Sequence, residues 1–97
     1  MKINDLRPRA SIDQITVKVI KLLSDRHVRS KHSDKELWLQ EFRVKDDTGD
    51  AILVLWEEDC GRVEPDDLVK IVNGYVKPSS NGGMRLTPGK YGSMEVL

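Results

Sequence analysis

Residues 42–56 constrain the fold of this chain most, because they read as two strands joined by a tight acidic turn. Phe42 and Val44 fall on one face of the first strand, and basic residues alternate with them on the other. Residues 46–49, Asp-Asp-Thr-Gly, supply turn chemistry, and the chain returns as a second strand over 51–56. The segment therefore predicts a β-hairpin with Phe42 and Val44 in the core.

The second strand of this hairpin is apolar on both faces, whereas a half-exposed strand alternates apolar with polar residues. Pairing Phe42 with Leu53 sends alternate residues of the strand inward. The side chains left on the outer face, beside Arg43, are Ile52, Val54 and Trp56. A second layer of this chain, a partner protein or a ligand with a flat apolar face would each cover them. An aromatic ring beside a cation suits a nucleic acid, because unpaired bases stack on such rings and their phosphates attract cations.

Length and composition indicate one intracellular domain. The 97 residues suit a single domain over 1–97, because roughly 100 residues build one hydrophobic core. Charged residues make up 33% of the chain and no run of about 18 apolar residues occurs, which argues against a membrane-spanning helix. The first residues lack the apolar core of a signal peptide, and Cys60 is the only cysteine, so no internal disulfide forms. These features predict a cytoplasmic protein.

The sequence contains no recognisable catalytic or metal-binding pattern. Zinc needs about four ligands at regular spacing, and Cys60 with His27 and His32 does not supply them. The acidic run 57–59 has no partner at a defined spacing, so we interpret it as a solvated turn. No nucleophile beside a base, phosphate-binding loop or carboxylate pair stands out. We therefore expect no metal, no cofactor and no enzymatic activity.

Charge is distributed unevenly along the chain, although the net charge is zero. Residues 7–45 hold ten Lys and Arg against five Asp and Glu, and residues 68–97 hold four against one. Residues 46–67, between them, hold one basic residue against nine acidic ones. If the two basic segments fold onto one side of the domain, they form a cationic groove that can attract phosphate.

The N-terminal third predicts a lead-in segment followed by a long strand. Residues 1–11 show no extended periodicity, and we expect them to cover one end of the domain. Residues 15–19 alternate cleanly and are mostly β-branched, which predicts a strand that begins near Ile12. The alternation slips over residues 20–23, as it does at a bulge or bend that lets a small barrel close.

Residues 26–36 are polar and mostly basic, which predicts a loop between the first and second strands. As a plain connection this loop would be solvated and mobile. As a flap over a nucleic-acid-binding face it would bring cations, Arg29 and Lys31 among them, to phosphate. Trp38, which follows the loop, is an even number of positions from Phe42 and so falls on the same face of a strand. We therefore assign Trp38 to the core, with base stacking as the alternative.

The second half of the chain predicts a helical turn and a strand with an irregular centre. The segment 57–63 is short and acidic and has a glycine near its C-terminal end, which is typical of one helical turn. Residues 68–77 predict the next strand, and Asn73-Gly74 within it favours either a hairpin or a bulge. We choose the bulge, because another turn follows at 78–83. A bulge reverses the alternation and turns Tyr75 outward.

Two further short segments, at 84–87 and near the C-terminal end, bring the number of strands to five or six. One helical turn follows the third strand, and no second apolar layer is present in the pattern. These elements predict an all-β fold, a five-stranded Greek-key OB-fold barrel with one short helical turn between strands three and four.

Several blocks of residues occur in order along nearly the whole chain. They are Ile3-Asn4-Asp5-Leu6-Arg7-Pro8, Asp46-Asp47-Thr48-Gly49 with Ala51-x-Leu53-x-Leu55-Trp56, Val69-Lys70-Ile71-x-Asn73-Gly74-Tyr75, and Arg85-Leu86-x-x-Gly89-Lys90-Tyr91-Gly92-x-Met94-Glu95-Val96. This arrangement resembles the archaeal replication protein A-related, single-stranded-DNA-binding OB domains. The resemblance implies a non-catalytic domain that binds unpaired DNA along one face of the barrel, by stacking and by contacts to the DNA backbone.

The resemblance also assigns site residues. Trp56 and Tyr75 match the aromatic positions that this family uses for base stacking. The other residues expected to contact nucleic acid are Arg43, Lys77, Arg85, Ile52 and Val54 in the same groove, and Arg29 and Lys31 in the basic loop. Relatives often carry a further aromatic residue where this chain has Pro78-Ser79-Ser80.

The partner implied by the resemblance is single-stranded DNA, in replication, repair or recombination, with replication or repair proteins as further partners. We expect a monomer or a weak oligomer with no membrane association. Two alternatives stay open on the residues alone. Single-stranded RNA would use the same stacking chemistry, and a protein-interaction subunit would dock another chain on its apolar outer face. The zero net charge and the acidic middle segment favour the second alternative.

Overall fold

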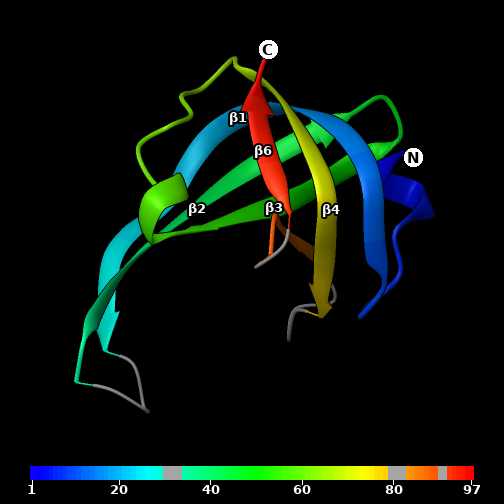
Figure 1. Ribbon diagram of the computed structural model, residues 1–97. Helices are drawn as coiled ribbons and strands as arrows, with labels where there is room; N and C mark the ends of the chain where they lie inside the picture. Colours follow the sequence, from blue (N-terminus) through cyan, green and yellow to red (C-terminus); the bar gives the residue numbers. More distant parts are fainter. Residues whose placement is uncertain (30–33, 79–82, 90–91) are drawn as a thin grey trace.

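One sheet of six strands forms most of the computed structural model, which describes residues 1–29, 34–78, 83–89 and 92–97 (Figure 1). The strands are β1 (Ser11–Arg29), β2 (Glu36–Asp46), β3 (Gly49–Trp56), β4 (Leu68–Pro78), β5 (Met84–Thr87) and β6 (Ser93–Val96). Two 3-10 turns accompany them, η1 (Ile3–Asp5) before β1 and η2 (Glu57–Asp59) between β3 and β4. In the described residues no helix is long and apolar enough to span a membrane.

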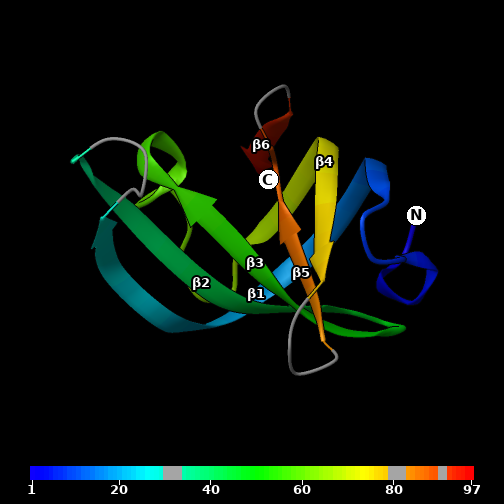
Figure 2. The same cartoon turned by 90° about the horizontal axis from the view of Figure 1, so that it is seen from below.

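The strands are paired in the order β1-β2-β3-β5-β4-β6, and β1 also pairs with β4, so that five strands close into a barrel. β3 and β5 are parallel, and the other pairs are antiparallel. Figure 2 shows β2, β3 and β5 side by side along one wall, while β6 extends the sheet beside β4. This is the predicted five-stranded Greek-key OB-fold barrel, and η2 is the predicted helical turn between strands three and four.

Apolar side chains that alternate along each strand fill the barrel interior. Phe42 lies opposite Leu53 and Val44 opposite Ala51, as the hairpin predicts. Each fully buried side chain of this size contributes about 1.5–3 kcal/mol relative to an exposed one, so the barrel core is the main source of stability. Its most deeply buried members include Ile12, Ile15, Val17, Val19, Val44, Leu53, Leu55, Val69, Ile71 and Leu86.

β1 bends where the sequence predicts a break in the alternation. Its register with β2 shifts between Val19 and Lys21, and again between Leu22 and Ser24. Such irregularities raise the local twist of a strand, which allows one long strand to serve two sides of a closed barrel. Residues 11–18 of β1 accordingly pair with β4, and the rest of β1 pairs with β2.

Beyond this bend β1 and β2 continue as a two-stranded arm, in which residues 24–29 pair with residues 36–41 (Figure 1). The basic loop predicted over 26–36 is therefore shorter than expected, because Arg29 and Glu36 are strand residues that lie opposite each other. Period-two analysis misses the far part of such an arm, since no face of it joins the core and cross-strand pairs hold it instead.

Trp38 fastens the arm to the barrel. The sequence assigns this residue to the core, and the structure leaves it half-buried at the edge of the core. Its indole N–H donates to Asp25 at 2.6 Å, and His27 stacks on its ring with the centroids 6.2 Å apart. Gln40 donates to the same carboxylate at 3.0 Å and accepts the backbone N–H of Gly61 at 2.8 Å. The hydrogen bonds from Trp38 and Gln40 lower the pKa of Asp25.

β4 runs through Asn73 and Gly74 without a turn, and Tyr75 points away from the core, both as predicted. Asn73 adopts a φ of 55°, in the left-handed region that Asn tolerates better than most residues. The predicted bulge needs a correction, because β1 and β4 keep the same register before and after this point and no extra residue is inserted. β1 changes its buried face at the same place as β4, so the two strands stay matched.

The lead-in segment covers the end of the barrel beside the acidic turn between β2 and β3. Asp46 accepts the backbone N–H of Ile3 at 2.7 Å, and Lys2 forms an ion pair with Asp47 at the same distance. Partial burial raises the pKa of Asp46, but hydrogen bonds from Thr48 and Ile3 outweigh burial and hold the pKa below its ordinary value. The acidic turn therefore serves as the attachment point of the lead-in segment.

Candidate nucleic-acid interface

The pairing of β2, β3, β5 and the second half of β4 aligns outward side chains in rows, and we call this surface the outer face. Arg43 lies opposite Ile52, which lies opposite Arg85, which lies opposite Lys77. In the neighbouring row, Glu41 lies opposite Val54 and Thr87 lies opposite Tyr75. Trp56 lies opposite Leu39 at the end of β3. Seven of the nine predicted contact residues thus share one surface: Arg43, Ile52, Val54, Trp56, Tyr75, Lys77 and Arg85.

The other two predicted contact residues do not join these rows. Arg29 is exposed at the far end of β1, on the arm. Lys31 lies outside the described residues. All described strands belong to one sheet, so no second layer of sheet or helix covers the outer face in the described part of the chain.

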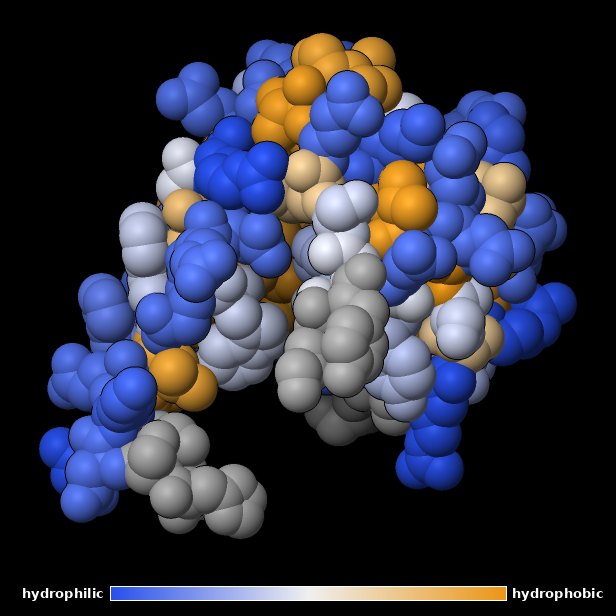
Figure 3. Space-filling view, viewed as in Figure 1, coloured by the Kyte–Doolittle hydropathy of each residue, from blue (hydrophilic) through white to orange (hydrophobic). Residues whose placement is uncertain are grey.

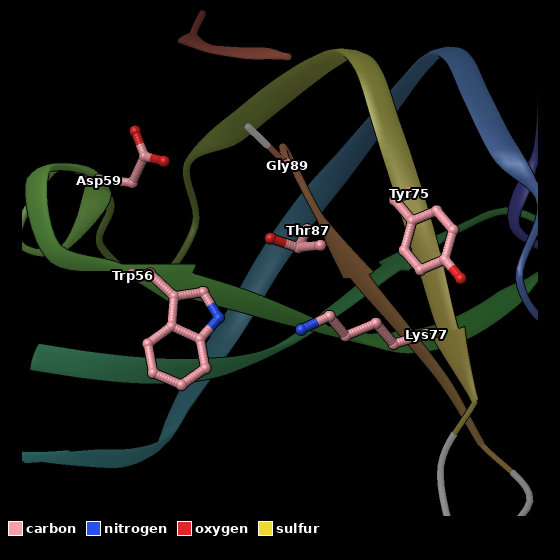
Figure 4. Close-up of a pocket in the computed structure, with 6 residues that line it drawn as sticks. All are labelled: Trp56, Asp59, Tyr75, Lys77, Thr87 and Gly89. Carbon is pink, nitrogen blue, oxygen red and sulfur yellow. The ribbon is translucent and has the colours of Figure 1, made fainter. Parts of the chain in front are cut away.

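A cavity of about 600 Å³ opens on the outer face, lined by Trp56, Asp59, Tyr75, Lys77, Thr87 and Gly89 (Figure 4). The Nζ atom of Lys77 lies 5.9 Å from the centroid of the Trp56 ring, a cation–π distance. Figure 4 shows the Lys77 amine and the Thr87 hydroxyl both directed toward Trp56, with the Tyr75 ring on the far side of the cavity. The cavity therefore offers two aromatic rings, a cation and a hydroxyl to one ligand.

The local sequence explains how the two rings reach this cavity. Trp56 is the last residue of β3 and keeps the outward parity of Ile52 and Val54. Tyr75 faces outward because the alternation of β4 reverses around Asn73, and its side chain remains exposed. Trp56 is half-buried, so part of its surface remains open to a ligand. A partly buried ring loses little conformational freedom when it binds a base.

A second, smaller cavity of about 170 Å³ lies at the other end of the same row, lined by Arg43, Asp50, Ala51, Ile52, Gly83 and Met84. Arg43 forms an ion pair with Asp50 at 3.4 Å, and both side chains are about half exposed or more. Ion pairs this exposed are worth roughly 0–1 kcal/mol, so Arg43 can exchange Asp50 for another anion at little cost.

Val54 differs from its neighbours because it is only 1% exposed. Glu41 lies opposite Val54 on β2, and Arg85 lies on β5 opposite the neighbouring outward residue Ile52; the two charged side chains form an ion pair of 2.7 Å. Arg26, from the arm, lies 3.4 Å from the other carboxylate oxygen of Glu41. Polar side chains therefore cover the apolar centre of β3, and the apolar residues of β3 that stay partly exposed on the outer face are Ile52 and Trp56.

Sequence reasoning missed several residues of this surface, among them Arg26, Glu41, Asp59 and Thr87. Parity along β2 would have placed Glu41 beside Arg43, and the same argument would have placed Thr87 beside Arg85. No signal in the sequence brings Asp59 or Arg26 to the outer face. Asp59 arrives there through η2, and Arg26 through the arm that was interpreted as a loop.

Apolar surface also lies beyond the outer face. Leu68, Val96 and Leu97 are exposed at the start of β4 and the end of β6, and the backbone N–H of Leu97 donates to the Leu68 carbonyl at 2.8 Å. Figure 3 shows apolar surface gathered over the end of β6, at the top of the view, with hydrophilic side chains around it. These residues belong to the β6 side of the sheet and are separate from the rows described above.

The chemistry of the site is that of binding through rings and charges. Among the described residues, no group of three or more His, Cys, Asp or Glu side chains is placed to hold a metal ion. Cys60 is buried, and its thiol donates to the carbonyls of Leu55 and Trp38 at 3.4 Å. Burial raises the pKa of Cys60, which keeps the thiol protonated and unreactive.

Comparison with known proteins points to one family. The profile of the family described as "Single-stranded DNA binding protein Ssb-like, OB fold" matches residues 6–96. The replication factor A related protein from Methanobacterium thermoautotrophicum superposes with a TM-score of 0.80 at 23% identity, covering 100% of this chain and 89% of that chain. The second OB-fold domain of replication protein A from Methanococcus maripaludis also gives a TM-score of 0.80, at 24% identity, covering 100% and 93%. No curated protein sequence matches at a significant level.

Proposed function

We propose that this chain, which belongs to the Ssb-like family of single-stranded DNA binding proteins with an OB fold, binds single-stranded DNA across its outer face. The observation that carries the proposal is the cavity of about 600 Å³, in which Trp56 and Tyr75 face one ligand space and Lys77 lies 5.9 Å from the Trp56 ring. Membership of the family supports nucleic-acid binding in general, and the cavity supports the particular surface.

In the proposed complex, unpaired bases stack on Trp56 and Tyr75. Each stacked base contributes about 1–3 kcal/mol, and stacking tolerates any base because every base has a π-face. The cations of the first row, Arg43, Arg85 and Lys77, neutralise phosphates, and each phosphate steepens the salt dependence of binding by roughly 0.7 in log–log slope. Two rings and three cations predict weak to moderate affinity with little base preference. The binding is non-catalytic.

The biological role that we propose is in replication, repair or recombination. The structural neighbours named above are a replication factor A related protein and one domain of replication protein A, which supports that role. Single-stranded RNA would stack on the same rings, so competition between oligothymidine and oligouridine decides which nucleic acid is preferred. Protein partners from replication or repair remain part of the proposal, and so does a monomeric or weakly oligomeric state.

The test is a titration of fluorescently labelled oligothymidine at low salt. Trp56→Ala should weaken binding about 5- to 150-fold, which corresponds to one stacked base. Trp38→Phe is the matched control, because it removes an indole that lies on the arm and away from the cavity. In that control Trp56 is the only remaining tryptophan, so its fluorescence should be quenched by DNA.

Equal binding by Trp56→Ala and by the unchanged protein would refute the proposal. A stable dimer that buries Trp56, with no binding of DNA, would instead support a protein-docking role for the outer face. Analytical ultracentrifugation of the unchanged protein and of Trp56→Ala separates these outcomes.

A further inference from the structure

An acidic side chain interrupts the basic outer face at its centre. Glu41 projects from β2 beside the row that holds Arg43, Ile52, Arg85 and Lys77, and its side chain is only 14% exposed. Its two carboxylate oxygens contact two different arginines: Oε2 lies 2.7 Å from Arg85 and Oε1 lies 3.4 Å from Arg26. Glu41 thereby holds one cation from β5 and one from the arm at the position where DNA phosphates would run.

The contact between Arg85 and Glu41 leaves the guanidinium incompletely bonded. One terminal nitrogen of Arg85 donates to Glu41, while its Nε atom is buried and has no hydrogen-bond partner among the described residues. A buried donor without an acceptor costs about 1–3 kcal/mol. A phosphate can accept two parallel hydrogen bonds from one guanidinium, through Nε and a terminal nitrogen. Arg85 therefore gains a hydrogen bond when it exchanges Glu41 for a phosphate.

We propose that Glu41 is an internal competitor of the DNA backbone, which occupies Arg85 in the free protein and gives it up to a phosphate when single-stranded DNA binds. This inference rests on the proposed function. It identifies Glu41 as a residue that sets affinity, although it touches no base. Glu41 occupies the row beside the cations, so a phosphate on Arg85 would approach the place of its carboxylate.

Arg26 makes the exchange feasible. A carboxylate that is nearly buried and loses its only cation is strongly destabilised. Glu41 has a second cation, and Arg26 is 56% exposed on a two-stranded arm, so it can move closer when Arg85 leaves. The two arginines and one carboxylate therefore form a set in which one cation is free to bind phosphate while the other keeps Glu41 neutralised.

The experiment compares Glu41→Gln with the unchanged protein in titrations of labelled oligothymidine. The salt concentration is varied over roughly one decade, from about 50 to about 500 mM. Glutamine keeps the shape and an acceptor oxygen but no longer competes as an anion. Affinity should rise about tenfold, because Arg85 no longer has to leave an anion before it binds the phosphate. The slope of log affinity against log salt should stay about the same, because Arg85 neutralises the same phosphate in both proteins. A slope steeper by about 0.7 would mean that Arg85 stays on Glu41 in the unchanged protein, and would overturn the proposal.

Asp50→Asn is the matched control, because it removes one acidic charge from the same face at an ion pair that is already exposed. Its effect on affinity should be within about threefold, since exposed pairs hold their cation weakly. An equal gain for Asp50→Asn and Glu41→Gln would show that only net charge matters, and would overturn the proposal. Thermal unfolding of both variants checks that each remains folded.

A double-mutant cycle with Arg85→Gln completes the test. If Glu41 acts through Arg85, Glu41→Gln should raise affinity clearly less in the Arg85→Gln background than in the unchanged protein. Equal gains in both backgrounds would overturn the inference. Failure of the proposed function is a different result, in which the unchanged protein does not bind or Trp56→Ala binds equally well.

Discussion

Gly74 is a position in β4 where the barrel has no room for a side chain, and Gly74→Ala tests the packing that places Tyr75 on the outer face. Gly74 is buried in β4, opposite Ile12 of β1. A Cβ atom at this position would lie 2.8 Å from the carbonyl oxygen of Thr87 and 2.8 Å from Cγ2 of Ile71. Its φ is not in the left-handed region, so the cost of alanine is steric.

The stability lost in Gly74→Ala depends on which of the two neighbouring atoms can move away from the new methyl group. The methyl group of Ile71 can shift by rotation, but the Thr87 carbonyl belongs to β5, which pairs with β4 at Tyr75. Relieving the contact therefore displaces β5 from β4, and overpacking of this kind costs typically 1–3 kcal/mol. Because one obstacle is backbone, we expect a loss of about 2 kcal/mol in the free energy of unfolding. In a domain of this size that corresponds to a melting temperature lower by about 10 °C.

Urea unfolding and thermal unfolding, both followed by circular dichroism, measure this loss. Gly83→Ala is the matched control: it also exchanges a glycine for alanine, but its Cβ would meet no described atom within 4 Å. We expect Gly83→Ala to change the free energy of unfolding by no more than about 0.5 kcal/mol, or to raise it slightly through the unfolded state. If Gly74→Ala is also within about 0.5 kcal/mol of the unchanged protein, the steric reasoning is wrong.

Two further predictions concern the carboxylates that hold the arm and the lead-in segment. Asp25→Ala removes the acceptor of Trp38 and Gln40, so amide hydrogen exchange should accelerate over 26–29 and 36–38 and stay unchanged over 12–19; a uniform change would refute a local role. The folded state lowers the pKa values of three carboxylates: Asp25, Asp46 and Asp47. The stability that they contribute is therefore complete above their unfolded-state pKa of about 3.9, and it is lost as the pH falls through their lower folded-state pKa values. The free energy of unfolding should therefore be level above about pH 5 and decline below about pH 4, and Asp46→Asn should make that decline shallower.

Much of the barrel was accessible from the sequence because its strands are half-buried and alternate. The hairpin register of Phe42 with Leu53, the irregularity of β1 at residues 20–23, and the outward turn of Tyr75 were all predicted and are present. Parity then places Arg43, Trp56 and their neighbours on one face. A period of two assigns residues to faces wherever one face is apolar.

The arm was not accessible in this way. Arg29 pairs with Glu36 in a region where neither face joins the core, so alternation carries no information there. The bulge predicted at Asn73-Gly74 was wrong for a related reason: β4 changes its buried face there, but no extra residue is inserted. The reversal in β4 was visible in its own residues, but the matching reversal in β1 could be recognised only when the two strands were paired.

The sequence by itself determined which side chains face outward, because alternation is a property of a single strand. Only the tertiary structure decided what those side chains meet, because neighbours across the sheet come from segments distant in the chain. Lys77 reaches Trp56 because β5 lies between β3 and β4, and Arg85 reaches Glu41, 44 positions earlier, across β3. The sequence predicts a row of outward cations. The structure shows in addition that Lys77 lies over the Trp56 ring and that Arg85 already forms an ion pair with Glu41.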